Sequence, residues 1–71
     1  MTDTELLHLA KMANQIAANV STSSSEEVIA ENVAMHMTKF WAPSMQEKLL
    51  EHQNDEEISL VPAVIKALEL L

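Results

Sequence analysis

The stretch His36-Met37-Thr38-Lys39-Phe40-Trp41-Ala42-Pro43-Ser44-Met45 decides how this chain folds. It contains the only Trp, the only Phe and one of the two prolines among the 71 residues. Proline disfavours helix at the residue before it and suits the first turn of a new helix. A helix should therefore end near Phe40, and another should begin at Pro43. We expect the aromatic pair to plug the open end of a helical bundle, in a core corner formed by Met37, Phe40, Trp41 and Pro43.

Apolar residues before this stretch recur at the spacing of two long helices. The first should run from near Asp3 to Val20, with an inner stripe of Leu6, Leu9, Ala13, Ile16 and Val20. The second should end near Phe40, with an inner stripe of Ile29, Val33, Met37 and Phe40. The serine-rich residues 21–25 between them predict a flexible loop, and Ser24 and Glu27 have the spacing of a capping box. Because this loop is short, the two helices should pack antiparallel.

Two shorter helices should follow the aromatic pair. One begins at Pro43 and carries Met45, Leu49 and His52 on one side. The acidic residues 53–57 break it, Ser59 is the expected cap of the last helix, and Pro62 fits early in that helix. The sequence thus predicts a single all-α domain over residues 1–71. This domain should be a small bundle of about four helices, two long and antiparallel followed by two shorter ones.

Composition excludes several classes of function. The chain has 11 acidic residues against 4 Lys and Arg, a net charge of -7, whereas nucleic acids and anionic membranes attract clustered cations. No apolar run approaches the roughly 20 residues of a membrane span. The first residues are acidic, unlike a signal peptide, so we expect a cytoplasmic protein. A chain this small has a weak core, and without cysteine it has no disulfide, which leaves a partner chain as the obvious source of stability.

The sequence indicates no enzyme site. Glu5 and His8 match one carboxylate–histidine unit of two-metal bundles, but such sites need a second unit and further inward glutamates. His36 and His52 lie beside apolar faces, where a histidine more often packs than catalyses. We therefore predict no catalytic, cofactor-binding or metal-binding residues. Trp41 has two interpretations, a core plug or an anchor for a partner protein, and the first is favoured because so few aromatic residues are available.

Several runs of this sequence resemble the delta subunit of NAD-dependent formate dehydrogenase. They are Lys11-Met12-Ala13-Asn14-Gln15-Ile16, the stretch from His36 to Met45, Leu49 with His52, and Leu60-Val61-Pro62-Ala63-Val64 followed by Ala67-Leu68. The first run and the Phe-Trp-x-Pro-x-Met pattern are the specific parts. Gln46 departs from the resemblance, since members of the family often carry Arg there.

This resemblance implies a non-catalytic accessory subunit, or an assembly or stabilising factor, of a cytoplasmic molybdenum- or tungsten-dependent formate dehydrogenase. Such a chain binds the catalytic subunit and carries no cofactor. Molybdopterin, iron–sulfur clusters, FMN and NAD belong to the partner subunits, which oxidise formate to carbon dioxide and reduce NAD. Periodicity alone favours a solvated back face for Lys11, Asn14 and Gln15, but the resemblance makes them partner contacts. The full set of hypothesised contacts is Lys11, Asn14, Gln15, His36, Lys39, Trp41, Met45 and His52.

An alternative of a different class is a self-associating helical adaptor unrelated to formate. Its contact would be the wide apolar face of the last helix, made of Leu60, Val61, Val64, Ile65, Leu68 and Leu71. The isolated chain would then be a homo-oligomer, and its mass in solution tests this alternative.

Overall fold

The regular secondary structure in the described part of the chain is entirely helical. The computed structural model describes residues 4–20 and 25–71, which form four helices and no strand. The helices are α1 (Thr4–Val20), α2 (Glu26–Phe40), α3 (Pro43–Glu51) and α4 (Pro62–Glu69). The predicted all-α class with about four helices is confirmed. The predicted start near Asp3, and residues 21–24 of the predicted loop, lie outside the described residues.

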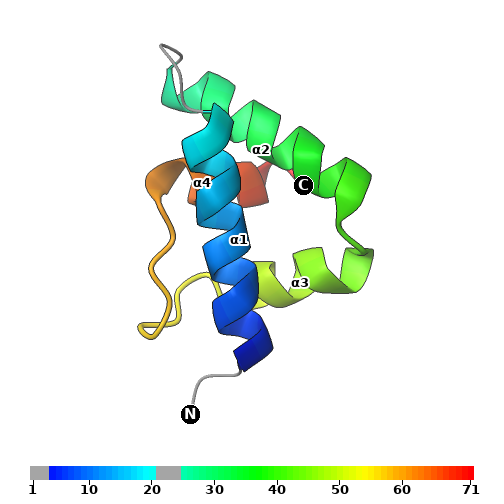
Figure 1. Cartoon of the computed structure of the whole chain (residues 1–71), viewed down its shortest axis with the longest axis vertical. Helices are drawn as coiled ribbons and strands as arrows, with labels where there is room; N and C mark the ends of the chain where they lie inside the picture. The colour runs from blue at the N-terminus through cyan, green and yellow to red at the C-terminus, as the bar shows by residue number, and fades with distance from the viewer. Residues whose placement is uncertain (1–3, 21–24) are drawn as a thin grey trace.

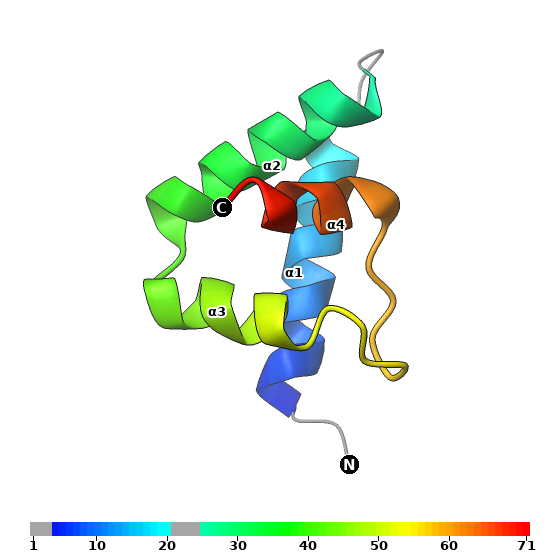
Figure 2. The same ribbon diagram turned by 180° about the vertical axis from the view of Figure 1, so that it is seen from behind.

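The first two helices do not form a simple antiparallel pair. Figures 1 and 2 show α2 leading obliquely away from the C-terminal end of α1. The most extensive helix–helix contact of α2 is with α4, and its contact with α1 is smaller. The remaining short helix, α3, packs against α1. Lys48 and Glu5 add an ion pair between these two helices, with 3.2 Å between Nζ and Oε1.

Capping residues and prolines set where the helices begin. The hydroxyl of Ser25 accepts a hydrogen bond from the backbone N–H of Val28 at 3.3 Å, so Ser25 is the N-cap of α2 rather than Ser24. The helices α3 and α4 start at Pro43 and Pro62. The expected cap at Ser59 is wrong, because Pro62 holds the residue before it in an extended conformation and makes Val61 the N-cap.

Alanine supplies much of the core. Of the 16 buried apolar residues in the described part, seven are alanines. Six of them form pairs one helical turn apart: Ala13 and Ala17 in α1, Ala30 and Ala34 in α2, Ala63 and Ala67 in α4. Residues at this spacing lie on the same face of a helix. Small side chains on such a face allow the axes of packed helices to approach closely.

The buried face of α2 differs from the inner stripe that the sequence predicts, which ran through Ile29, Val33, Met37 and Phe40. It consists of Ala30, Val33, Ala34 and Met37, and Trp41 continues it directly after the helix. Trp41 is extended, and its backbone N–H donates to the carbonyl of Met37 at 2.9 Å. The Trp41 side chain is only 5% exposed, whereas that of Phe40 is 72% exposed. The expectation that Phe40 belongs to the core corner is therefore wrong.

Gln46 holds the turn between α2 and α3. Its side-chain amide donates to the carbonyl of Met37 at 3.0 Å and to the carbonyl of Trp41 at 3.2 Å. The Met37 carbonyl also accepts from the Trp41 N–H, so Gln46 gives it a second donor and gives the Trp41 carbonyl a donor just beyond the end of α2. Pro43 is exposed, so it starts α3 without belonging to the core, which corrects the second member of the predicted corner.

Replacing the two aromatic residues should have very different effects on folding. Trp41→Ala should lower the free energy of unfolding by about 3–5 kcal/mol, because it empties a buried site. Phe40→Ala should change it by no more than about 0.5 kcal/mol, because the ring is mostly in solvent. Urea denaturation followed by circular dichroism measures both. Equal losses would contradict this structure.

Gln46→Met should lower the free energy of unfolding by about 1–2 kcal/mol, because two hydrogen bonds to backbone carbonyls are lost while side-chain length and helix propensity are kept. Gln46→Arg should retain most of the stability, since a guanidinium has several N–H donors within reach of the same carbonyls. Urea denaturation followed by circular dichroism measures the free energy of unfolding of both variants. If Gln46→Met were as stable as the natural chain, the turn would not depend on these bonds.

Candidate protein-binding surface

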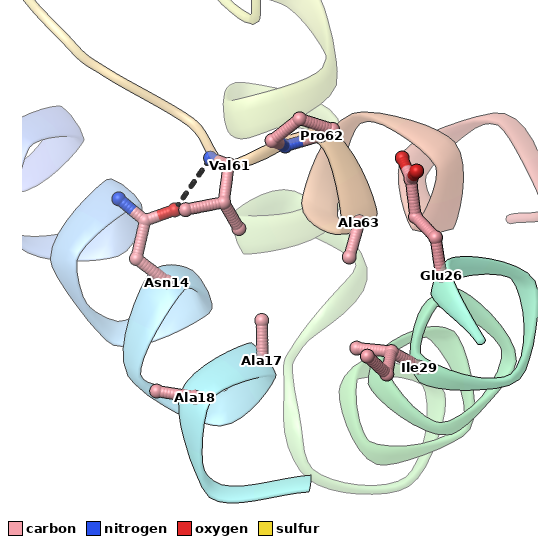
Figure 3. A pocket seen from close by; sticks show the side chains of 8 residues that line it. All are labelled: Asn14, Ala17, Ala18, Glu26, Ile29, Val61, Pro62 and Ala63. Carbon is pink, nitrogen blue, oxygen red and sulfur yellow. Dashed lines mark hydrogen bonds between the residues drawn. The ribbon is translucent and has the colours of Figure 1, made fainter. Parts of the chain in front are cut away.

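Asn14 joins α1 to the segment that leads into α4. Its Nδ2 donates to the carbonyl of Ser59 at 2.6 Å, and its Oδ1 accepts from the N–H of Val61 at 3.0 Å, the bond drawn in Figure 3. A side-chain amide has one carbonyl and one NH₂ group, so it can satisfy both kinds of backbone group at once. The amide of Asn14 thus fixes the segment before Pro62 alongside α1.

The same segment is held at its other end by Asp55. The Asp55 carboxylate accepts from the N–H of Glu57 at 2.9 Å, and the Asp55 carbonyl accepts from the N–H of Ile58 at 3.3 Å. The side chain of Ile58 is buried, with 7% exposed. The residues from Asp55 to Val61 therefore have a defined path although they form no helix.

Two hollows lie on either side of the Asn14 contacts. The first has a volume of about 340 Å³ and lies between α1, α2 and the start of α4, as Figure 3 shows. Its lining consists of Asn14, Ala17, Ala18, Glu26, Ile29, Val61, Pro62 and Ala63. The second has a volume of about 430 Å³ and is lined by Leu7, Ala10, Lys11, Asn14, Gln15, Ala18, Glu57, Ile58 and Ser59.

We call the region around the second hollow the α1 surface, meaning Leu7, Lys11, Asn14, Gln15, Ala18 and residues 57–59. Lys11 and Gln15 are exposed, and Leu7 is 44% exposed. Asn14 is half-buried, and its amide is already bonded within the chain. The structure thus brings the three hypothesised contacts of α1 together on one hollowed surface. It also shows that Asn14 shapes this surface, while Lys11 and Gln15 present their side chains to solvent.

A second surface lies at the last turn of α2. We call it the α2-end surface, meaning Met35, His36, Lys39 and Phe40, all of which are exposed. The rings of His36 and Phe40 lie against each other, with 4.7 Å between their centroids and 44° between their planes. His36 and Lys39 are hypothesised contacts, but Phe40 is not among them, because the sequence interpretation placed it in the core.

The other hypothesised contacts do not share one surface. Trp41 is buried in the core, and Met45 is half-buried and packed against it. His52 is exposed at the C-cap of α3, at the opposite end of that helix from the aromatic pair. The structure therefore favours the plug interpretation of Trp41. A partner role for any of the eight residues stays a prediction.

The apolar face of α4, which the self-association alternative requires, is used only in part inside the domain. Val64 and Leu68 on this face are buried, with 0% and 1% exposed. Val61, Ile65 and Leu71 are 39%, 37% and 42% exposed. The centre of this face is therefore covered by the chain itself, and its margin is exposed.

The described residues include neither a metal-binding cluster nor a membrane-spanning helix. In residues 4–20 and 25–71, no group of three or more His, Cys, Asp or Glu side chains is placed to hold a metal ion. No helix in the described part is both long and apolar enough to cross a membrane.

Comparison with known families gives one match. Residues 8–68 match the family described as "NADH-dependant formate dehydrogenase delta subunit FdsD". The chain belongs to this family. The match to the delta-subunit family includes the Lys11–Ile16 run and the Leu60–Val64 run, which the two hydrogen bonds of Asn14 bring together. Searches of curated proteins and of solved structures found no match.

Asn14→Ala should lower the free energy of unfolding by about 1–2 kcal/mol, because two hydrogen bonds are lost in one substitution. The amide hydrogen of Val61 should also exchange faster with solvent, because its acceptor has gone. Hydrogen exchange followed by nuclear magnetic resonance measures this at the single residue. Asn32→Ala is the matched control, since Asn32 is an exposed asparagine within α2. An unchanged Val61 exchange rate would show that Asn14 does not hold the segment.

Proposed function

We propose that this chain is a non-catalytic small subunit, or an assembly or stabilising factor, of an NAD-dependent formate dehydrogenase, and that it acts by binding the catalytic subunit. The observation that carries the proposal is the family match over residues 8–68. A delta subunit is by description one component of a larger enzyme, so its contribution requires contact with the other chains.

The α1 surface supports such a contact. It has an apolar floor that includes Ala10 and Ile58, and polar side chains such as Lys11 and Gln15 at its edge. Protein interfaces commonly have this organisation of an apolar centre and a polar rim. Because Asn14 and Asp55 already hold residues 55–61, little of this surface needs to be ordered on binding. A rigid surface loses less conformational entropy on association and so binds more tightly.

Under this proposal the chemistry belongs to the partner subunits. They would oxidise formate to carbon dioxide and reduce NAD, using molybdopterin, iron–sulfur clusters and FMN, in the cytoplasm. The small chain would contribute to the assembly or stability of the catalytic subunit and hold no cofactor itself.

Substitution of two exposed residues tests the proposal together with the surface. The tagged chain is co-expressed with the remaining formate dehydrogenase subunits of its host and purified gently. The natural chain should recover the catalytic subunit, and Lys11→Ala with Gln15→Ala should reduce the recovered amount at least about fivefold, as expected when a few central contacts carry the binding energy. Both positions are exposed, so folding should be unaffected.

Lys66→Ala with Asn32→Ala is the matched control, because it removes one exposed lysine and one exposed amide elsewhere. It should recover the catalytic subunit as the natural chain does. Failure of the natural chain to recover any formate dehydrogenase subunit would overturn the proposed function. Full recovery by the Lys11 and Gln15 variant would leave the function standing and reject the α1 surface as the contact.

A further inference from the structure

We infer that the α2-end surface is a second binding site for the catalytic subunit, and that it inserts Phe40 into an apolar socket rimmed by carboxylates. This inference rests on the proposed function and adds a different surface, an anchoring residue and the chemistry of the partner's site. None of these follows from the family match.

Phe40 is the exposed member of the aromatic pair. The chain has only two aromatic residues outside its histidines, and it buries one while leaving the other 72% exposed. A domain with a small core gains stability from every large apolar side chain that it covers. A Phe left in solvent does not contribute this free energy to folding. Aromatic side chains are enriched at protein interfaces, where covering them supplies much of the binding energy.

The Phe40 ring already contacts another ring of α2 in the free chain. His36 lies one turn earlier on α2, and its ring contacts that of Phe40 with 4.7 Å between the centroids. A neighbouring ring restricts the rotamers that Phe40 can adopt. Less side-chain entropy is then lost on binding, which is the property expected of an anchor rather than of an incidental surface residue.

The α2-end surface lies in a stretch of sequence that lacks acidic residues. Between Glu31 and Glu47 the sequence has no Asp or Glu, although the whole chain has 11 acidic residues. The acidic residues of α2, Glu26, Glu27 and Glu31, all lie in its first half. Lys39 forms no ion pair with any residue that the structure describes. The α2-end surface thus has no acidic side chain of its own and presents apolar and basic side chains, and its complement is an apolar socket with carboxylates at the rim.

A second copy of this chain is the competing occupant. A hollow of about 270 Å³ on the described part of the chain has three glutamates in its lining, which consists of Glu27, Ala30, Glu31, Lys66, Glu69 and Leu70. Lys66 in that hollow would face the incoming Lys39. The contact would also join two different faces, and head-to-tail contacts of this kind generate open chains of molecules unless the rotation closes a ring. These points assign the socket to the catalytic subunit instead.

The test measures the affinity of the full chain for the purified catalytic subunit by biolayer interferometry. Phe40→Ala should weaken binding at least about tenfold, as for an anchoring residue, without a change in the melting temperature. Val28→Ala is the matched control, because Val28 is a 43% exposed apolar residue at the other end of the same helix. This control should bind as the natural chain does.

Salt dependence tests the carboxylate rim. Binding of the natural chain should weaken as NaCl is raised from 50 to about 500 mM, because screening reduces the attraction of Lys39 to carboxylates. Lys39→Gln should make binding to the catalytic subunit less dependent on salt than binding of the natural chain. At low salt, Lys39→Glu should bind more weakly than Lys39→Gln. Equal salt dependence of the natural chain and Lys39→Gln would overturn the carboxylate rim.

The outcomes separate this inference from the proposed function. If the natural chain binds the catalytic subunit and Phe40→Ala binds equally well, the inference fails and the proposed function stands. If the natural chain does not bind at all, both fail. If light scattering shows that the natural chain is an oligomer that Phe40→Ala converts to a monomer, the occupant is a second copy and the inference is overturned.

Discussion

The structure depends on the two hydrogen bonds between the Asn14 amide and the backbone of Ser59 and Val61. The residues before Pro62 form no helix, so their backbone groups need partners from elsewhere. Asn14 supplies a donor and an acceptor from the middle of α1, in the way that a neighbouring strand would. Because this anchor lies directly before α4, it fixes the position of the first residues of α4 against α1. It thereby also influences how α4 packs against α2. Asn14 also lines both hollows beside α1, so the contact that positions α4 also shapes the α1 surface.

Alanine pairs make that arrangement tight enough to be stable. A chain with one buried aromatic residue and no cysteine cannot rely on large side chains or cross-links. The pairs in α1, α2 and α4 let helix backbones approach, which gains dispersion contacts along the whole helix rather than at a few side chains. The buried parts of a protein interior are packed at the density of organic crystals, which resists rearrangement. The surfaces on either side of this core are consequently presented in a defined geometry.

The sequence was sufficient to predict the helical class, the approximate helices and the family, because these depend on periodicity, proline positions and long matching runs. The sequence was insufficient where two aromatic residues could both occupy the same buried site. Phe40 and Trp41 both lie about one turn beyond Met37, and only the extended backbone at Trp41 decides which is buried. The role of Asn14 was missed because its partners are 45 and 47 residues away. An amide in mid-helix, where Asn is a poor helix former, was the one local signal.

The neighbouring aromatic residues show how a very small domain can divide stability from recognition. Trp41 is buried and closes the core, so a change there removes the folded surface as well as any contact. Phe40 lies one residue earlier, on the outside of the last turn of α2, and its position is fixed by the same turn that buries Trp41 and that Gln46 caps. The core thus orients the exposed ring without covering it. A partner that covers Phe40 would contact this turn directly, so binding would depend on the turn between α2 and α3 being correctly formed.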